Sequence, residues 1–220
     1  MSTRPSLTPE FLLDVYARGY FPMADDRHAT ELFWVDPERR GILPLDAFHL
    51  PRRLGRTVRQ DRFGVTVDRD FTQVIEACAA AGEGRARTWI NDEIIAAYTA
   101  LHRAGHAHSV ETRDAQGRLV GGLYGVRLGG AFFGESMFSR ATDASKVALV
   151  HLVARLRTGG FGLLDTQFTT THLQQFGTVE IPRDEYRARL QQALPLDADF
   201  YRLPPMLDGA TALQSITQTS

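Results

Sequence analysis

The sequence has 220 residues, 43% of them hydrophobic, and a formal net charge of −1. A chain of this length can bury a core as one domain, or as a compact domain with a smaller partner, and its near-neutral charge excludes a wholly basic nucleic-acid coat. Cys78 is the only cysteine, which excludes an intramolecular disulfide and a multi-cysteine metal site.

The first 60 residues predict a small mixed lobe, residues 1–60. A helix is expected from Thr8 to Gly19, because a hydroxyl cap, a proline in the first turn and a glycine beyond the last turn mark its ends. Residues 31–48 hold prolines and glycines between short apolar runs, which predicts short strands and turns. The lobe ends in a predicted helix with one strongly positive face, formed by Arg52, Arg53, Arg56 and Arg59.

From Phe63 the pattern becomes regular and predicts a second domain, residues 61–220. Alternating apolar residues predict strands over 63–67, 107–112, 119–128, 131–137, 162–167 and 179–181. Helical periodicity and caps predict helices over 70–81, 91–105, 143–157, 171–176 and 182–193. The tail after Leu194 has three prolines and no clear period, which predicts coil. This order matches the α+β acyltransferase fold of the GNAT type, a mixed sheet flanked by helices, by fold-level analogy alone.

No segment reads as a targeting or membrane-spanning element. The first 20 residues lack an apolar run preceded by basic residues. No stretch approaches the roughly 18 continuous apolar residues of a membrane span. We therefore expect a cytoplasmic protein.

Several familiar motifs are incomplete. Ser136 lies in Gly-Glu-Ser-Met-Phe, which lacks the final glycine of a nucleophile elbow, and residues 121–125 lack the spacing of a dinucleotide-binding loop. His106 and His108 share a strand face, but period-two counting puts Glu111 on the opposite face. We therefore expect neither a metal site nor a cofactor.

Two carboxylates lie in apolar strands. Glu135 stands in residues 132–138, where both strand faces are apolar, which predicts a strand covered on both sides. Asp165 ends another apolar strand, and Gln167 follows two residues later on the same face. Charged residues are seldom buried unless they are paired or used in chemistry. These three residues are therefore functional candidates, the alternative being that the carboxylates point outward.

Trp34 and Trp89 are the only tryptophans, and both lie in turn-rich contexts. Each is either a core anchor or, beside a basic face, a platform on which a nucleobase stacks. The residues alone leave both readings open.

A set of short motifs, in order along residues 8–193, resembles the bacterial leucyl/phenylalanyl-tRNA-protein transferases. The motifs include Gly19-Tyr20-Phe21-Pro22-Met23, Pro37-x-x-Arg40-Gly41-Ile42, Thr88-Trp89-Ile90, Gly134-Glu135-Ser136-Met137-Phe138-Ser139 and Asp165-x-Gln167. Members of this family transfer Leu or Phe from aminoacyl-tRNA to the α-amine of proteins that begin with Arg or Lys. The added residue marks those proteins for degradation in the N-end rule pathway.

The resemblance implies roles for the candidate residues. Asp165 and Gln167 match the family's catalytic pair, so we expect the Asp165 carboxylate to act through Gln167 in orienting and deprotonating the amine. We expect Glu135 to hold the cationic amine, or the Arg or Lys side chain, of the acceptor. The donor side chain is expected in a pocket formed by Leu123, Phe132, Met137, Leu152, Leu156 and Leu164.

The donor tRNA would contact aromatic and basic residues. Trp34 and Trp89 match family positions and become candidates to stack on the terminal adenosine. We expect tRNA phosphates to bind Arg52, Arg53, Arg56, Arg59 and Lys146, which predicts a steep salt dependence. Two rival functions remain, an acyl-CoA-dependent GNAT N-acyltransferase and a non-catalytic RNA-binding module. The arginine-rich helix and the missing pyrophosphate loop argue against the first.

Overall fold

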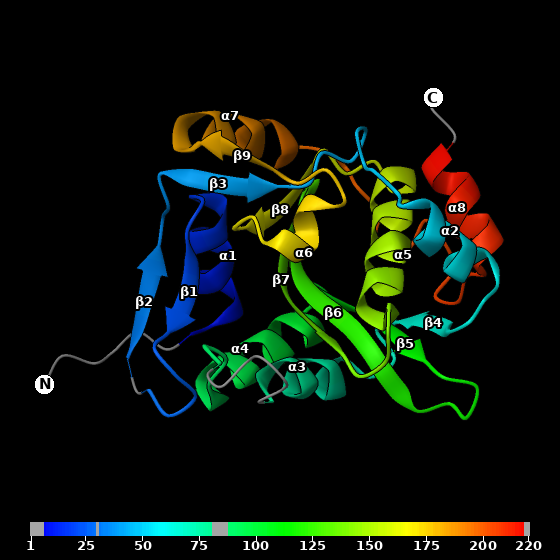
Figure 1. The fold of residues 1–220 in the computed structure, drawn as a ribbon. Helices are drawn as coiled ribbons and strands as arrows, with labels where there is room; N and C mark the ends of the chain where they lie inside the picture. The colour runs from blue at the N-terminus through cyan, green and yellow to red at the C-terminus, as the bar shows by residue number, and fades with distance from the viewer. Residues whose placement is uncertain (1–6, 30, 81–87, 218–220) are drawn as a thin grey trace, which may run out of the picture.

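The computed structural model describes residues 7–29, 31–80 and 88–217. Over these ranges a seven-stranded mixed sheet carries helices on both faces, and a two-stranded sheet stands beside it (Figure 1). The predicted α+β class, with a mixed sheet flanked by helices, is confirmed.

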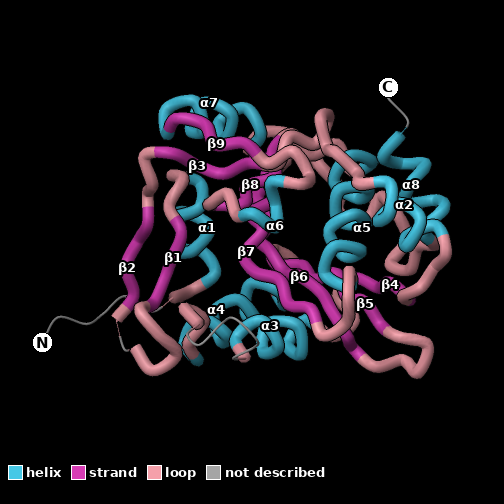
Figure 2. Tube along the Cα trace, in the orientation of Figure 1, coloured by secondary structure: helices cyan, strands magenta, loops and turns pink. Residues whose placement is uncertain are grey.

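The N-terminal segment supplies elements to both sheets. Its elements are α1 (Pro9–Ala17), β1 (Phe21–Ala24), β2 (Leu32–Val35), β3 (Arg39–Ile42) and α2 (Arg52–Arg59). The predicted cap is present, because the Thr8 side chain accepts a hydrogen bond from the Phe11 amide at 3.3 Å. Strands β1 and β2 form the small sheet beside α1 (Figure 2), whereas β3 inserts between β8 and β9 of the large sheet.

The strand order of the large sheet is β4-β5-β6-β7-β8-β3-β9. Its remaining strands are β4 (Gly64–Val67), β5 (Ala107–Arg113), β6 (Leu119–Leu128), β7 (Ala131–Ser139), β8 (Leu163–Gln167) and β9 (Val179–Pro182). Each lies within a residue or two of its predicted range. Neighbouring strands are antiparallel, apart from the parallel pair of β7 and β8.

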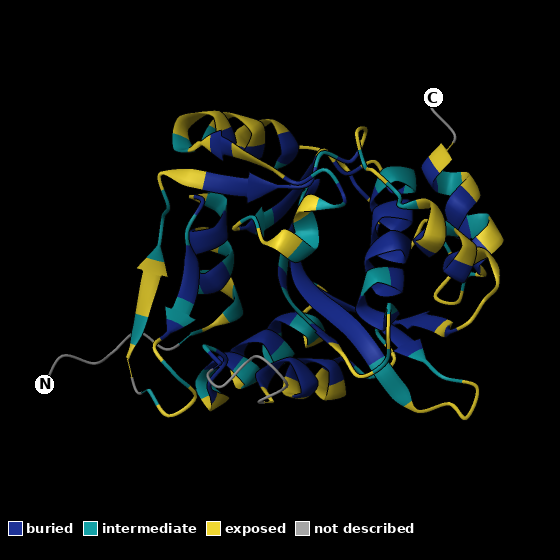
Figure 3. Cartoon of the chain, in the orientation of Figure 1, coloured by how far each residue is buried: buried dark blue, intermediate teal, exposed yellow. Residues whose placement is uncertain are grey.

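Helices enclose this sheet in two layers. The further helices are α3 (Phe71–Ala79), α4 (Asp92–Arg103), α5 (Ala144–Thr158), α6 (Thr171–Gln174), α7 (Arg183–Ala193) and α8 (Gly209–Thr217). One core cluster contains residues of α1, α3, α4 and α7, and the other contains residues of α2, α5 and α8. Helix α5 is buried along most of its length, whereas α7 and α8 expose one face (Figure 3). The predicted end of the helix over 70–81 lies outside the described residues.

The C-terminal segment corrects the prediction of coil after Leu194. Helix α8 forms there and packs against α2 and α5, burying Gly209, Ala212, Leu213 and Ile216. Upstream of α8, the Arg155 guanidinium donates hydrogen bonds of 2.6–2.8 Å to the carbonyls of Phe200, Leu203 and Pro204. The prolines break the local pattern, and the contacts that order the segment come from helices distant in the sequence.

A β-bulge in β7 places Glu135. Tyr124 of β6 faces Ser136 and Gly125 faces Gly134, so Glu135 is an extra residue without a cross-strand partner. Such a bulge breaks the period-two alternation and redirects the side chain. Gly125 permits the close approach, because an added Cβ would lie 2.3 Å from the carbonyl oxygen of Phe133.

We predict that Gly125→Ala lowers the free energy of unfolding by about 2 kcal/mol or more, because the new methyl group overlaps the backbone and the Phe132 ring. Gly64→Ala on β4 is the matched control, since an added Cβ there meets no atom within 4 Å. Urea unfolding of both variants measures the difference. Equal stability of the two would contradict this account of the bulge.

Candidate active site

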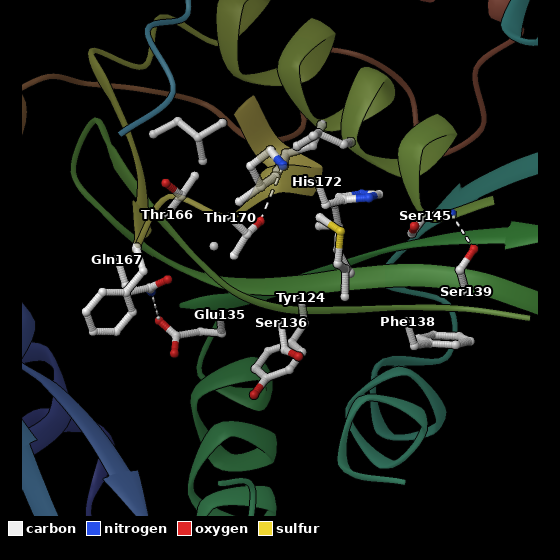
Figure 4. A pocket seen from close by; sticks show the side chains of 18 of the residues that line it. Tyr124, Glu135, Ser136, Phe138, Ser139, Ser145, Thr166, Gln167, Thr170 and His172 are labelled. Carbon is white, nitrogen blue, oxygen red and sulfur yellow. Dashed lines mark hydrogen bonds between the residues drawn. The ribbon is translucent and has the colours of Figure 1, made fainter. Parts of the chain in front are cut away.

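A cavity of about 580 Å³ opens where β7 and β8 separate. The two strands pair from Ala131 with Leu163 to Phe133 with Asp165, and β7 then continues alone to Ser139. Side chains of β7, β8, α5 and α6 surround the space beyond the last pair (Figure 4). The walls are mostly apolar, so the cavity suits an apolar side chain with a few polar groups at its ends.

Most of the predicted pocket residues line this cavity. Those that do are Trp89, Leu123, Met137, Leu152 and Leu164. Phe132 and Leu156 do not, and both are fully buried in the core. Phe132 precedes the point where the strands separate, and Leu156 lies one turn beyond Leu152 toward the paired end. Trp34 lies on β2, 36% exposed, with its ring against Phe11 at 5.5 Å.

Sequence reasoning missed several cavity residues. Leu149 lies three residues before Leu152 on α5, so helical periodicity already predicted that the two share a face. Phe21 and Met23 reach the cavity from β1, and Phe168 follows β8. No local pattern identifies Phe21 and Met23, because their place depends on how the small sheet lies beside the large one.

Glu135 is buried at one end of the cavity. Its Oε1 accepts a hydrogen bond from Gln167 Nε2 at 3.0 Å, and its Oε2 accepts one from the Tyr98 hydroxyl at 3.3 Å. The Tyr98 hydroxyl is also hydrogen-bonded to that of Tyr16. Burial raises the pKa of Glu135 to about 8, and the nearby Asp165 carboxylate adds to the rise against opposing hydrogen bonds and Arg40. This carboxyl group therefore titrates close to neutral pH.

Asp165 is fully buried behind the cavity wall. Arg40 of β3 binds its carboxylate through Nη2 at 2.6 Å and Nε at 3.0 Å, and the Tyr186 hydroxyl donates at 2.8 Å. The backbone amide of Gln167 also donates a hydrogen bond to Asp165 Oδ1, at 2.8 Å. The backbone of Gln167 has a φ angle of +56°, a left-handed conformation that residues other than glycine seldom adopt. The structure thus brings Glu135, Asp165 and Gln167 together, and Asp165 holds the backbone from which Gln167 reaches Glu135.

Arg40 contacts the candidate residue Asp165, but the sequence analysis assigned no role to Arg40. It belongs to a motif of the family resemblance, but the sequence does not show which carboxylate it meets. Its Nη1 also donates to the Gly19 carbonyl at 2.9 Å. The partner becomes visible only once β3 is placed next to β8.

The predicted basic face has two parts. Arg52, Arg56 and Arg59 line a second hollow of about 320 Å³ with Leu50, Pro51 and Gly55. Arg53 instead lies 3.5 Å from Asp143, whose other oxygen is 3.2 Å from the Lys146 ammonium. The pair of Arg53 and Asp143 therefore connects α2 with the beginning of α5, where Lys146 also lies, beside the main cavity.

Two of the residues considered for a metal, His108 and Glu111, have other partners. His108 Nδ1 lies 2.8 Å from an Asp68 oxygen, and Glu111 accepts hydrogen bonds from Thr66 and Ser109. Within residues 7–29, 31–80 and 88–217, no group of three or more His, Cys, Asp or Glu residues is arranged to hold a metal ion. In the same part of the chain, no helix is both long and apolar enough to cross a bilayer.

We predict that Glu135 makes stability depend on pH. Because its pKa is raised in the folded state, the folded chain binds this proton more tightly than the unfolded chain does. The stabilisation is fully present below about pH 4.5 and is lost as pH rises toward 8, at up to roughly 1.4 kcal/mol per pH unit. Urea unfolding at pH 5, 6.5 and 8 should show a smaller decline for Glu135→Gln than for the unsubstituted protein. Parallel declines would contradict the assignment.

Comparison with known proteins gives a consistent family. The protein-family model described as "Leucyl/phenylalanyl-tRNA protein transferase" matches residues 42–191, and the family model of the N-terminal domain matches residues 6–38. The leucyl/phenylalanyl-tRNA-protein transferase of Phenylobacterium zucineum is 63% identical over 214 residues, which are 95% of this chain and 96% of that protein. Those of Maricaulis maris and Caulobacter vibrioides are each 59% identical, covering 96% and 98% of this chain and 97% and 99% of their own. The chain belongs to the leucyl/phenylalanyl-tRNA-protein transferase family.

Proposed function

We propose that this protein moves Leu or Phe from aminoacyl-tRNA to the N-terminal α-amine of proteins that begin with Arg or Lys, marking them for N-end rule degradation in the cytoplasm. The observation that carries the proposal is a single cavity with apolar walls and a buried carboxylate-amide pair, Glu135 and Gln167, at one end. The names of the relatives support an aminoacyl-tRNA donor and a protein acceptor.

The apolar wall would hold the donor side chain. The side chains of Leu123, Leu149, Leu152 and Leu164 form no hydrogen bonds, and Met137 adds a flexible, largely apolar side chain, so this wall binds any apolar group that fits. Such a wall discriminates by only about 1–3 kcal/mol per methylene, which is consistent with accepting both Leu and Phe. Trp89, in the same wall, would stack on the terminal adenine. No contact described for Trp34 supports the same role.

The Glu135 end would hold the reacting amine. Aminolysis joins the amine nitrogen to the ester carbonyl carbon, breaks the bond to the ribose oxygen, and moves one proton from the amine to that oxygen. An α-amine has a pKa of about 7.7–8.0, and burial brings Glu135 to about 8, so the two exchange a proton at little cost. Gln167 would fix the carboxylate through its 3.0 Å hydrogen bond.

Asp165 would act as a positioning residue for this reaction. Its carboxylate is enclosed by Arg40, Tyr186 and the backbone amide of Gln167. Asp165 would therefore act on the amine through Gln167, as the resemblance implies. Its contribution would be to hold Gln167 in the conformation that reaches Glu135. Productive geometry of this kind supplies much of the barrier reduction in group transfer.

Two features bear on the rival functions. The separation of β7 from β8 beyond a parallel pair supports a GNAT-like fold, in which an acyl donor sits in a split sheet. An acyl-CoA donor would need a pyrophosphate loop that the sequence lacks. A module that only binds RNA would have no use for a buried carboxylate with a raised pKa beside an apolar cavity.

The proposal is tested by incubating the protein with radiolabelled Leu-tRNA and a peptide that begins with Arg. We expect label on the peptide, and we expect Gln167→Ala to lower kcat at least tenfold while changing the Leu-tRNA Kd by less than about threefold, because Gln167 orients reacting groups.

Gln73→Ala, an exposed change on α3, is the matched control and should leave both constants unchanged. Transfer from leucyl-CoA rather than from Leu-tRNA would overturn the proposal, as would no transfer at all by the unsubstituted protein.

We predict that the arginines of α2 bind tRNA phosphates. Replacing Arg52, Arg56 and Arg59 together with Gln should weaken Leu-tRNA binding and reduce the slope of log Kd against log salt, by roughly 0.7–0.9 for each phosphate that is no longer neutralised. Filter binding between 50 and 200 mM salt measures the slope. Arg118→Gln, an exposed change in the β5-β6 turn, is the control. An unchanged slope in the triple variant would place the tRNA elsewhere.

A further inference from the structure

Helix α2 carries the arginine-lined hollow, yet its own sequence disfavours a helix. Its eight residues include four arginines and no acidic residue. Helices shorter than about 12–15 residues are marginal in water, and like charges three or four positions apart repel each other. Arg52 and Arg53 stand in the first turn, where the helix dipole disfavours positive charge, and no side-chain hydrogen bond caps that turn among the described residues. Contacts with the rest of the fold must therefore keep α2 helical.

The contacts that hold α2 come from α5 and α8. Leu54 and Val58 belong to the same buried cluster as residues of both helices. A pair of 3.5 Å also joins Arg53 to Asp143 at the beginning of α5, but the Arg53 side chain is 80% exposed, and exposed ion pairs contribute little. Burial of the apolar face is therefore the main stabilisation of α2, and α8, which lies beside it, supplies part of the surface against which that face packs (Figure 1).

The end of α2 is joined closely to the beginning of α8. The Gly209 amide donates a hydrogen bond of 2.6 Å to Oδ1 of Asp61, which lies just beyond the end of α2. Asp61 has a φ angle of +46°, a left-handed conformation that Asp and Asn tolerate better than other residues with a side chain. A Cβ added to Gly209 would lie 1.9 Å from the carbonyl oxygen of Val58, so glycine allows the two backbones to approach this closely. A displacement of α8 therefore moves the last turn of α2.

We propose that α8 is a positioning element for the donor tRNA: it keeps α2 helical and in place, so that Arg52, Arg56 and Arg59 form one surface for phosphates. This proposal rests on the phosphate contacts proposed above for α2. Helix α8 contains no charged residue, so it adds no charge to that surface and acts through the geometry of α2. An unfolded α2 would have to become ordered when the tRNA binds, and the entropy cost would weaken the affinity. The helix preformed against α8 avoids that cost.

Two substitutions of equal charge at Asp61 test the link between the helices. Asp61→Asn keeps a carbonyl oxygen for the Gly209 amide and tolerates the left-handed backbone, whereas Asp61→Ala does neither. We expect the Kd for Leu-tRNA to be about tenfold higher in Asp61→Ala than in Asp61→Asn, the effect of losing one contact to a charged group. The kcat at saturating Leu-tRNA and the KM for the Arg peptide should differ by less than about twofold, because the chemistry is unchanged. Equal Kd values in the two variants would overturn the proposal.

Gly209→Ala tests the same link from α8, with Gly64→Ala as the control, since an added Cβ at Gly64 meets no atom within 4 Å. We expect Gly209→Ala to raise the Kd for Leu-tRNA and to reduce the slope of log Kd against log salt, as replacement of the arginines does. In the variant with Arg52, Arg56 and Arg59 replaced by Gln, Gly209→Ala should have no further effect, because α8 acts through those side chains. An effect of the same size in both backgrounds would contradict a role through α2.

Hydrogen exchange follows α2 without any tRNA. We expect the amides of residues 55–59 to exchange roughly tenfold faster in Gly209→Ala than in the unsubstituted protein, while those of α4 stay unchanged. Unchanged exchange in α2 would reject the proposal, and so would faster exchange with an unchanged Kd for Leu-tRNA.

If Gly209→Ala fails to fold, the two Asp61 variants decide by both measurements. Transfer and Leu-tRNA binding by the unsubstituted protein are measured first, so that failure of the proposed function is recognised separately from failure of the link between α8 and α2.

Discussion

The ion pair between Arg40 and Asp165 is the interaction on which the geometry of the site depends. Both side chains are almost wholly excluded from solvent, and burying two charges is tolerated only when their hydrogen bonds are satisfied. Here they are, because the guanidinium binds both carboxylate oxygens and the Gly19 carbonyl. It also lies 4.5 Å from the ring centroids of Phe21 and Tyr186. Removing either charge would leave the other buried and unpaired, at a cost of about 3–5 kcal/mol.

This pair links the N-terminal segment to the chemistry. Arg40 lies on β3, which enters the large sheet next to the strand that carries Asp165. Asp165 in turn accepts a hydrogen bond from the backbone amide of Gln167, and the side-chain amide of Gln167 donates to Glu135. A displacement of β3 would therefore be transmitted through three consecutive interactions to the carboxyl group at the cavity. The N-terminal segment acts on the site through this series of hydrogen bonds, and through Phe21 and Met23 in the cavity wall.

Local patterns in the sequence predicted the elements well, because caps and periodicity are properties of neighbouring residues. The Thr8 cap, the arginine-rich helix α2 and the strands from β4 to β9 all appear close to their predicted ranges. The burial of Glu135 was favoured because its strand is apolar on both faces, and Asp165, for which an outward position stayed open, is buried as well.

What the sequence could not show depends on contacts between distant residues. The bulge at Glu135 arises from the pairing of β6 with β7, so period-two counting along one strand does not reveal it. Phe132 and Leu156 satisfy the apolar pattern as well as the true cavity residues do, and only the point at which β7 and β8 separate distinguishes them. The residues that helix α8 buries stand at i, i+3, i+4 and i+7, so a helical period was present, but the prolines before it favoured the prediction of coil, and its neighbours α2 and α5 order it.

The pKa of Glu135 bears on how one cavity would hold two substrates of opposite charge, the anionic donor tRNA and the cationic acceptor amine. A permanently charged carboxylate would repel the tRNA backbone, whereas a permanently neutral acid would offer little to an ammonium group. With a pKa of about 8, the group is mostly protonated at pH 7 in the empty cavity, and a nearby ammonium favours its ionised form. Binding of the acceptor would therefore create the charge that holds it, after a neutral site has admitted the donor. The same burial that lowers the stability of the fold at alkaline pH would in this way allow two oppositely charged substrates to occupy one cavity.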